Sequence, residues 1–522
     1  MNRILFLLAV ALAPAALLAA EPVPDLIDQD AATLQAAMAD GRLTSAVIVA
    51  AYIDRIRRID DEGPQLNAVI ALFPDAAEQA RRLDAERAAG RVRGPLHGIP
   101  VLLKDNIEAA GELPTTAGSL ALKDNVTGRD AFLVARLRDA GAVILGKTNL
   151  SEWANFRDNR SSSGWSAVGG LTRNPHDPTR SACGSSSGSG AAVAASLAPI
   201  AIGTETDGSI VCPSGVNGIV GFKPTVGLVS RTHIVPISAT QDTAGPMTLT
   251  VRDAAAALTV MAGTDRADAA TAMAREVQQD YVAALRPDAL KGKRVGVMMD
   301  RLGDRADIRA LLETALATMT AAGAEVVRID DSRTGLDGLG DAEYAVLLTE
   351  FKEGMAAYLA SLPGKAMPRT LADLIAFNAA NPAALRWFGQ DVFLAAEATK
   401  GLSDPDYRTA RDKAARLGGP EGIDRLLGAH KVDLLIGITN GPAWTIDLVN
   451  GDNFVPPSAS QLPAVAGYPH LSVPMGAVEG LPVGLSIIGP RWADADVLAA
   501  GHAYELASRK RVRPTYRPAA SK

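Results

Sequence analysis

Short apolar runs of strand length alternate with amphipathic stretches of helical period along nearly the whole 522-residue chain. Alternation of this kind indicates helices layered on a sheet, and no Pro- or Ser-rich linker divides the chain, so we predict a layered α/β fold. The expected strands are 99–103, 142–145, 199–203, 294–299, 325–329, 432–438 and 482–489. The expected helices are two within 30–58, then 75–89, 130–140, 191–197, 307–322 and 494–508. Segments 264–293 and 331–425 are more variable, and we expect them to be insertions around a cleft.

The first twenty residues differ from the rest of the chain. Arg3 precedes an apolar run over residues 4–18, which ends in small residues before Glu21. This pattern is typical of a secretory signal peptide, which we assign to residues 1–20, and the run is short for a membrane span. An uncleaved anchor is the alternative. The expected location is periplasmic or secreted, with no membrane span after signal removal.

Composition excludes several classes of function. The net charge is -6 and there is no basic arm or zinc-finger spacing, so nucleic-acid binding is not expected. His, Cys and carboxylate residues show no metal-ligand spacing, so we predict no metal and no organic cofactor. Cys183 and Cys212 are the only cysteines. They could pair in an oxidising compartment, but two buried free thiols are favoured.

Lys104 directly follows the buried strand expected at 99–103. Strand ends of this kind are where α/β folds place their ligands. Burial there favours the neutral amine, which can act as a base. The alternative is a lysine whose stem lies on the core while its ammonium reaches water.

Two Gly- and Ser-containing segments follow Lys104 along the chain. Residues 183–190 precede a helix of Ala and Val, so they form a turn that presents hydroxyl and amide groups rather than a flexible linker. Residues 203–213 follow a strand, and a tight turn there can aim successive N–H groups at one point, as an oxyanion hole requires. Ser209 at the end of this turn is the candidate nucleophile, and an ordinary polar loop is the alternative.

Together, these motifs resemble the amidase signature family of serine hydrolases. Their order, the 24 positions between Ser185 and Ser209, and the run 221–225 all agree with the family pattern. The resemblance implies a single large α/β/α layered domain over residues 25–515 with a central mixed twisted sheet. It also implies a serine amidohydrolase that works through an acyl-enzyme.

The resemblance assigns a role to each motif residue. Ser209 would attack the amide carbonyl, Lys104 would be the neutral base, and Ser185, with a cis peptide bond, would bridge the two. Ser186 would support the network by hydrogen bonding. The oxyanion would be stabilised by backbone N–H groups of Thr206, Asp207, Gly208 and Ser209.

Four positions depart from the commonest family pattern: Cys183, Glu205, Asp207 and Val211. The resulting combination resembles bacterial peptide amidases, which implies removal of the C-terminal amide of peptides with release of ammonia. Small aliphatic, aryl or fatty amides are the alternative substrates. A catalytically silent binding subunit with the same fold is the non-enzyme alternative. The sequence does not indicate an oligomeric state.

Two further motifs match other enzymes by their letters. Residues 141–148 fit the phosphate-loop pattern, but the intervening residues are apolar and β-prone, so we expect a strand. Residues 184–188 fit the nucleophile elbow, which requires a catalytic histidine later in the chain. His430, His470 and His502 are available, but no neighbouring residues mark any of them as catalytic. Trp153, Phe156 and Trp165 are candidates for the acyl pocket or for the core.

Overall fold

A mixed sheet of eleven strands runs through the centre of the protein. The computed structural model describes residues 24–364 and 367–517, so the signal peptide expected at 1–20 lies outside the described residues. In sheet order the strands are β1 (Val69–Leu72), β3 (Val143–Thr148), β2 (Pro100–Lys104), β6 (Ile200–Glu205), β8 (Thr243–Thr248), β7 (Val220–Lys223), β12 (His470–Val478), β13 (Leu481–Ile488), β11 (Leu434–Ile438), β9 (Arg294–Met298) and β10 (Glu325–Ile329). β4 (Trp165–Ser166) and β5 (Gly170–Leu171) form a separate ribbon.

The sheet combines parallel and antiparallel pairs, as the family resemblance implies. β2 is parallel to both β3 and β6, and β9 is parallel to β10 and β11. The other neighbours are antiparallel. All five residues of β2 and all six of β6 are buried, which is expected for parallel strands covered on both faces.

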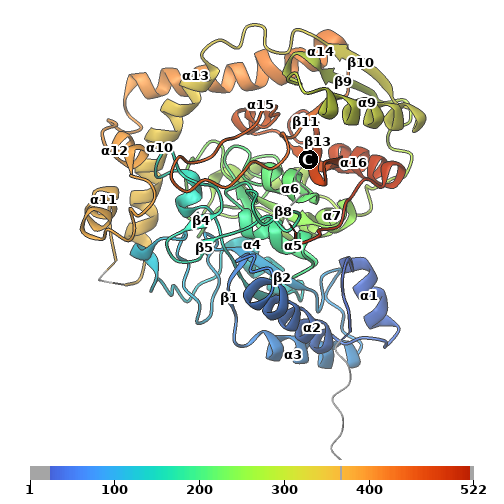
Figure 1. Ribbon diagram of the computed structural model, residues 1–522, viewed down its shortest axis with the longest axis vertical. Coiled ribbons are helices and arrows are strands. Elements are labelled where there is room, and N and C mark those ends of the chain that lie inside the picture. Colours follow the sequence, from blue (N-terminus) through green and yellow to red (C-terminus); the bar gives the residue numbers. More distant parts are fainter. Residues whose placement is uncertain (1–23, 365–366, 518–522) are drawn as a thin grey trace, which may run out of the picture.

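Helices cover the sheet and extend beyond its edges (Figure 1). Their bounds are α1 (Ala31–Ala39), α2 (Ser45–Ile56), α3 (Ala76–Ala88), α4 (Phe132–Asp139), α5 (Ser187–Ala194), α6 (Val211–Asn217), α7 (Val251–Met261), α8 (Ala274–Val277), α9 (Ala306–Ala321), α10 (Leu339–Ser361), α11 (Leu371–Ala380), α12 (Asp391–Glu397), α13 (Pro405–Gly418), α14 (Arg425–His430), α15 (Gln461–Ala466) and α16 (Asp494–Ser508). Short 3-10 and π segments complete the set: η1 (Arg57–Glu62), η2 (Leu120–Leu122), η3 (Glu152–Asn155), η4 (Ala269–Met273), η5 (Met299–Arg301) and η6 (Gly419–Asp424).

Two consecutive residues of β12 show that the sheet is covered on both faces. The Leu471 side chain packs against Gly501 of α16, where a Cβ on that glycine would overlap it. The next side chain, Ser472, points to the other face of the sheet. On that face α6 packs closely, because a Cβ on Gly484 of β13 would lie only 3.0 Å from the Cα of Gly215 in α6. The layered α/β/α arrangement is therefore confirmed.

Small residues let α5 approach the sheet closely. All eight residues of α5 are buried. A Cβ on Gly188 would overlap the backbone oxygens of Ala68 and Asn149, so only glycine fits at this contact. The close approach fixes the first turn of α5, which carries the serine-rich segment, against the ends of the strands.

The segment 331–425 forms α10 to α13, which frame one side of the molecule in Figure 1. Phe351 of α10 packs against Phe393 of α12 with ring centroids 5.3 Å apart. Residues Tyr344 and Leu347 of α10 and Val392 of α12 line the larger cavity described below, as expected for an insertion around a cleft. Within the described ranges, no helix combines the length and apolarity needed to cross a bilayer.

Candidate active site

The carboxyl ends of the neighbouring parallel strands β2 and β6 bring Lys104 beside Thr204. The register pairs Leu103 with Ile202, so both strands end at the same edge of the sheet. Lys104 is fully buried, and its Nζ lies 2.7 Å from Ser185 Oγ and 2.8 Å from Thr204 Oγ1. Asn106 Nδ2 donates to the same threonine hydroxyl at 2.9 Å.

Burial controls the charge of Lys104. Removal from water disfavours the ammonium and lowers the pKa of Lys104 to about 7, against the opposing effect of the carboxylates of Asp242 and Glu205. The neutral Lys104 amine is therefore well populated near pH 7. A neutral amine held 2.7 Å from a serine hydroxyl can accept its proton.

The serine-rich turn precedes α5 and enters the site through a cis peptide bond. This bond joins Gly184 to Ser185, and Cys183 has a positive φ of 56°. The helix begins at Ser187, four residues before the expected start, and Ser187 Oγ donates to the Cys183 carbonyl at 2.5 Å. Gly184 has no room for a side chain, because a Cβ would overlap Ser151 Oγ.

The second turn lies between β6 and α6 and carries Ser209. Glu205 Oε2 accepts hydrogen bonds from the N–H groups of Ile210 (2.7 Å) and Val211 (3.0 Å). These bonds tie the start of the turn to its end and so fix its shape. Gly208 has a φ of 80°, a conformation that glycine adopts without strain. In the described part of the chain, the N–H groups of Asp207, Gly208 and Ser209 donate to no other residue. They are free to bind a ligand oxygen.

Ser186 joins the two turns. Its N–H donates to the Ser209 carbonyl at 3.2 Å and its hydroxyl donates to the Thr204 carbonyl at 3.1 Å. Ser186 therefore holds the second turn next to Ser185. The structure thus brings Lys104 and Ser185 into direct contact. No hydrogen bond between the hydroxyls of Ser185 and Ser209 is present among the described residues.

Three contributors to this geometry are not among the site residues chosen from the sequence: Asn106, Thr204 and Glu205. Asn106 follows the buried strand β2, and Thr204 and Glu205 are the last two residues of the buried strand β6; this position at strand ends is the signal that would have found them. The oxygen of the Asn106 amide is buried and has no hydrogen-bond partner among the described residues. Thr204 holds the Lys104 amine, and Glu205 shapes the Ser209 turn.

Two cavities meet at the turns. The larger, of about 480 Å³, is lined by Thr206, Asp207, Gly208 and Ser209 together with residues of α10, α12 and the segment 444–460. The smaller, of about 230 Å³, reaches Ser185, Thr204 and Asn106 from the other side. Ser209 and the free N–H groups therefore face the larger cavity, whereas Ser185 faces the smaller one.

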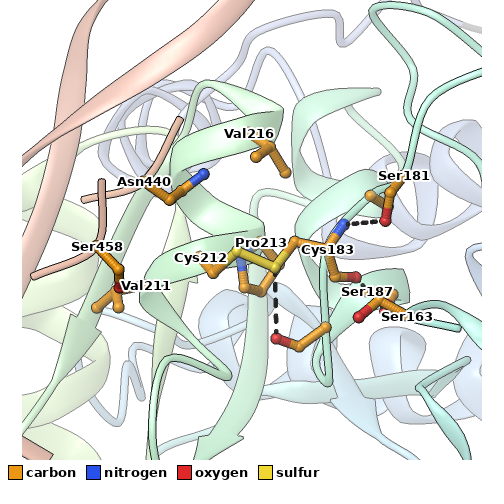
Figure 2. The surroundings of a disulfide bond; sticks show 12 residues. Ser163, Ser181, Cys183, Ser187, Val211, Cys212, Pro213, Val216, Asn440 and Ser458 are labelled. Carbon is orange, nitrogen blue, oxygen red and sulfur yellow. Dashed lines mark hydrogen bonds between the residues drawn. A yellow bond between two sulfur atoms is a disulfide. The ribbon is translucent and has the colours of Figure 1, made fainter. Parts of the chain in front are cut away.

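The preference for two free thiols was wrong, because Cys183 and Cys212 form a disulfide (Figure 2). Their Cα atoms are 6.0 Å apart, a separation that a disulfide spans. Cys183 precedes the cis bond and Cys212 lies in the first turn of α6, and the packing of α5 against α6 brings them together. The disulfide therefore joins the Ser185 turn to the Ser209 turn and forms part of the cavity wall.

The other motifs have structural roles. Residues 143–148 are strand β3, as expected, and the buried Lys147 Nζ donates to the Ile107 carbonyl at 2.5 Å and lies 3.4 Å from Asp105 Oδ1. His470 Nε2 is 2.6 Å from Ser486 Oγ, and His430 Nε2 is 2.8 Å from Asp331. His502 lies 3.8 Å from Glu505.

The three aromatic candidates divide between core and cavity. Trp153 packs edge-on against Phe393 with centroids 5.8 Å apart, and Trp165 packs against Phe388 at 5.2 Å. Phe156 lines the larger cavity, so it alone of the three contributes to that wall.

Comparisons with known proteins agree with this site. The amidase family model matches residues 47–498. A probable amidase of Arabidopsis thaliana is 39% identical over 493 residues, covering 92% of this chain and 90% of the relative. A glutamyl-tRNA(Gln) amidotransferase chain of Acidothermus cellulolyticus is 36% identical, covering 93% and 96%. The solved native peptide amidase of Stenotrophomonas maltophilia is 52% identical with a TM-score of 0.90, covering 95% of this chain and 100% of that one. With a buried lysine–serine contact, a turn of free N–H groups and matches over almost its full length, this chain belongs to the amidase signature family and is an amidase.

Proposed function

We propose that the protein is a serine amidohydrolase that removes the C-terminal amide of peptides, with Ser209, Ser185 and Lys104 as its catalytic residues. The observation that carries the proposal is the buried Lys104 amine, whose pKa is lowered to about 7 and whose Nζ lies 2.7 Å from Ser185 Oγ. The turn that carries Ser209 and its free N–H groups adjoins this pair. The two adjoining turns and the end of β2 thus supply candidates for the nucleophile, the bridging serine, the base and the oxyanion donors.

The reaction proceeds in two halves. Ser209 Oγ attacks the amide carbonyl carbon, its proton passes to Ser185 Oγ, and the Ser185 proton passes to Lys104 Nζ. The tetrahedral intermediate collapses, the C–N bond breaks, and the relay returns the proton to the leaving nitrogen, which departs as ammonia. A water molecule then attacks the acyl-Ser209 ester by the same relay, which yields the carboxylic acid and regenerates the serine.

The negative charge that develops on the carbonyl oxygen needs donors already in place. The N–H groups of Asp207, Gly208 and Ser209 have no acceptor in the described chain, so they can serve without breaking a bond. Loss of one donor of this kind typically costs ~10²–10³ in rate. Glu205, which closes the turn, and Ser186, which docks it on the other turn, act as positioning residues.

Two observations favour peptide amides over small aliphatic or aryl amides. The peptide amidase of S. maltophilia shares 52% of its sequence with this chain over nearly the full length. The larger cavity, of about 480 Å³, also has the size of a site for a peptide end rather than for a two-carbon amide.

We further propose that the protein acts in the periplasm or outside the cell. The expected signal peptide supports this location. The Cys183–Cys212 disulfide supports it too, because disulfides persist in oxidising compartments. Cell fractionation with a mass measurement of the mature chain tests it: a cytoplasmic protein that retains residues 1–20 would contradict the proposal.

The function is tested by ammonia release from a peptide amide and from its free-acid counterpart. Release from the amide alone is expected, with loss of at least ~10⁴-fold in kcat for Ser209→Ala, because the nucleophile is absent. Ser403→Ala, at a serine outside both cavities, is the matched control and is expected to act like the wild type. Unchanged release by Ser209→Ala would place the nucleophile elsewhere, and turnover of aryl amides alone would refute the peptide-amide assignment.

A further inference from the structure

The larger cavity is acidic. Three aspartates, Asp158, Asp207 and Asp452, line it, and none of its described lining residues is Lys, Arg or His. The charge of Asp158 has a partner, because the Arg160 guanidinium lies 4.0 Å away and the Arg160 N–H donates at 2.9 Å. Asp207 lies beside the carboxyl of Glu343, and burial raises the pKa of both groups, which disfavours a full negative charge on each of them.

Asp452 remains as a carboxylate without a cation. Its Oδ1 accepts from Ser163 N–H and Trp444 Nε1–H, each at 3.0 Å, and its Oδ2 accepts from Ser163 Oγ at 2.5 Å. Desolvation raises the pKa of Asp452, and these hydrogen bonds oppose that rise. The donors are all neutral, and no Lys, Arg or His of the described chain lies within ion-pair distance of Asp452. Because Asp452 also lines the open cavity, it is held in place while its negative charge stays available to a ligand.

A pair of aromatic rings adjoins this carboxylate. Trp444 and Phe454 pack edge to face with centroids 5.4 Å apart, and both line the cavity. Phe454 is 41% exposed, so its ring is accessible to a ligand in the cavity. A carboxylate beside aromatic rings suits an alkylammonium or guanidinium group, which gains from the charge and from the ring faces.

Ser163 connects this group to the reaction centre. Its hydroxyl, bound to Asp452, lies 3.1 Å from the Cβ position of Gly184, which is bonded to Ser185. Trp444 packs with Cys183 and Cys212, the disulfide that joins the two turns. Asp452 and Ser209 line the same cavity and adjoin through this wall, which places a cation at Asp452 near the substrate residue whose amide reacts.

We propose that Asp452, Trp444 and Phe454 form a cation subsite, so that the enzyme prefers peptide amides that carry a positive charge on or next to the C-terminal residue. The charge can come from a Lys or Arg side chain or from the N-terminal ammonium of a dipeptide amide. The inference rests on the proposed function and adds its substrate class.

The test compares kcat/KM for N-acetylglycyl-lysine amide, the norleucine amide and the glutamate α-amide, in which the blocked N-terminus leaves the side chain as the only charge. Unblocked glycyl-norleucine amide tests the N-terminal ammonium as the second source. We expect the lysine amide to exceed the norleucine amide by about tenfold, which corresponds to ~1.4 kcal/mol, and the glutamate amide to be the poorest substrate. Asp452→Asn is expected to reduce the lysine-to-norleucine ratio to about 2 or less, because it removes the charge and keeps the shape.

Asp412→Asn removes one charge from an exposed residue of α13 outside the cavity, so it is the matched control and should keep the wild-type ratio. The wild-type ratio should also fall as NaCl is raised from about 0.05 to 0.5 M, which tests the charge without a variant. Equal kcat/KM for the lysine amide, the norleucine amide and the unblocked glycyl-norleucine amide, or an unchanged lysine-to-norleucine ratio in Asp452→Asn, would overturn the subsite. If no peptide amide releases ammonia, the proposed function itself fails. The subsite is then decided by inhibition of aryl-amide hydrolysis, where equal inhibition constants for the lysine and norleucine peptides would overturn it.

Discussion

The pH dependence of kcat/KM reports directly on Lys104. With a pKa of about 7, the neutral fraction of this buried amine is about 0.09 at pH 6, 0.5 at pH 7 and 0.9 at pH 8. We expect kcat/KM to rise about tenfold per pH unit below pH 6 and to level off above pH 8. An ordinary lysine with a pKa of 10.5 would instead extend the rise to about pH 10.

The assay is ammonia release from a neutral peptide amide between pH 5 and 10, corrected for enzyme stability at each pH. Asp207→Asn is the control, because burial also raises the pKa of Asp207 to about 7. The midpoint should persist in this variant if Lys104 is the titrating group. A profile that keeps rising to pH 10, or a midpoint that disappears in Asp207→Asn, would refute the assignment of the base.

Stability gives a second measure of the same lysine. Its pKa is lower in the folded protein (about 7) than in the unfolded chain (10.5), so unfolding binds a proton at neutral pH. This destabilises the fold by roughly 4 kcal/mol at pH 7, and the penalty fades as the pH rises toward 10.5. Lys104→Met removes that penalty but leaves hydrogen-bonding groups unpaired, at a cost of ~1–3 kcal/mol. We expect an inactive variant that is ~1–3 kcal/mol more stable to urea at pH 7, and lower stability would contradict the reasoning.

Three other predictions concern the frame of the site. Reduction of the Cys183–Cys212 disulfide, or replacement of both cysteines by serine, should lower the free energy of unfolding by ~3–4 kcal/mol, given the separation of 29 residues. It should also reduce kcat, because the two turns lose their covalent link. Unchanged kcat in dithiothreitol would refute a role of this link in catalysis. Gly188→Ala should lower the free energy of unfolding by more than ~3 kcal/mol, because a Cβ would overlap backbone oxygens. The control Gly428→Ala lies in open space on a helix and should leave that free energy unchanged or raise it by up to ~1 kcal/mol. Equal effects of the two variants in thermal unfolding would contradict the packing argument. Lys147→Met should lower the free energy of unfolding by ~3–5 kcal/mol, because it leaves the buried carboxylate of Asp105 without its ion-pair partner. A loss below ~1 kcal/mol would show that the Asp105 carboxyl is protonated in the folded protein.

The sequence identifies the elements whose residues follow one regular pattern. The final helix was expected at 494–508 and is α16 (Asp494–Ser508), and the strand expected at 325–329 is β10 (Glu325–Ile329). The short strand β8 (Thr243–Thr248) is not predicted, because its Thr-Ala-Gly-Pro-Met-Thr sequence has no apolar alternation and carries an internal Gly and Pro, which are unusual in a central strand. Its strand conformation is stabilised by pairing with β6 and β7, which are brought beside it only in the folded sheet.

The same division holds for the site. Motif spacing alone named Lys104, Ser185 and Ser209 as candidates and indicated the family. The contact between Lys104 and Ser185, the disulfide between positions 183 and 212, and the supporting roles of Thr204 and Asn106 depend on tertiary structure. Local sequence fixes backbone preferences over a few residues. Strand order and burial bring residues about eighty positions apart to within 3 Å and remove the water that would keep the lysine charged.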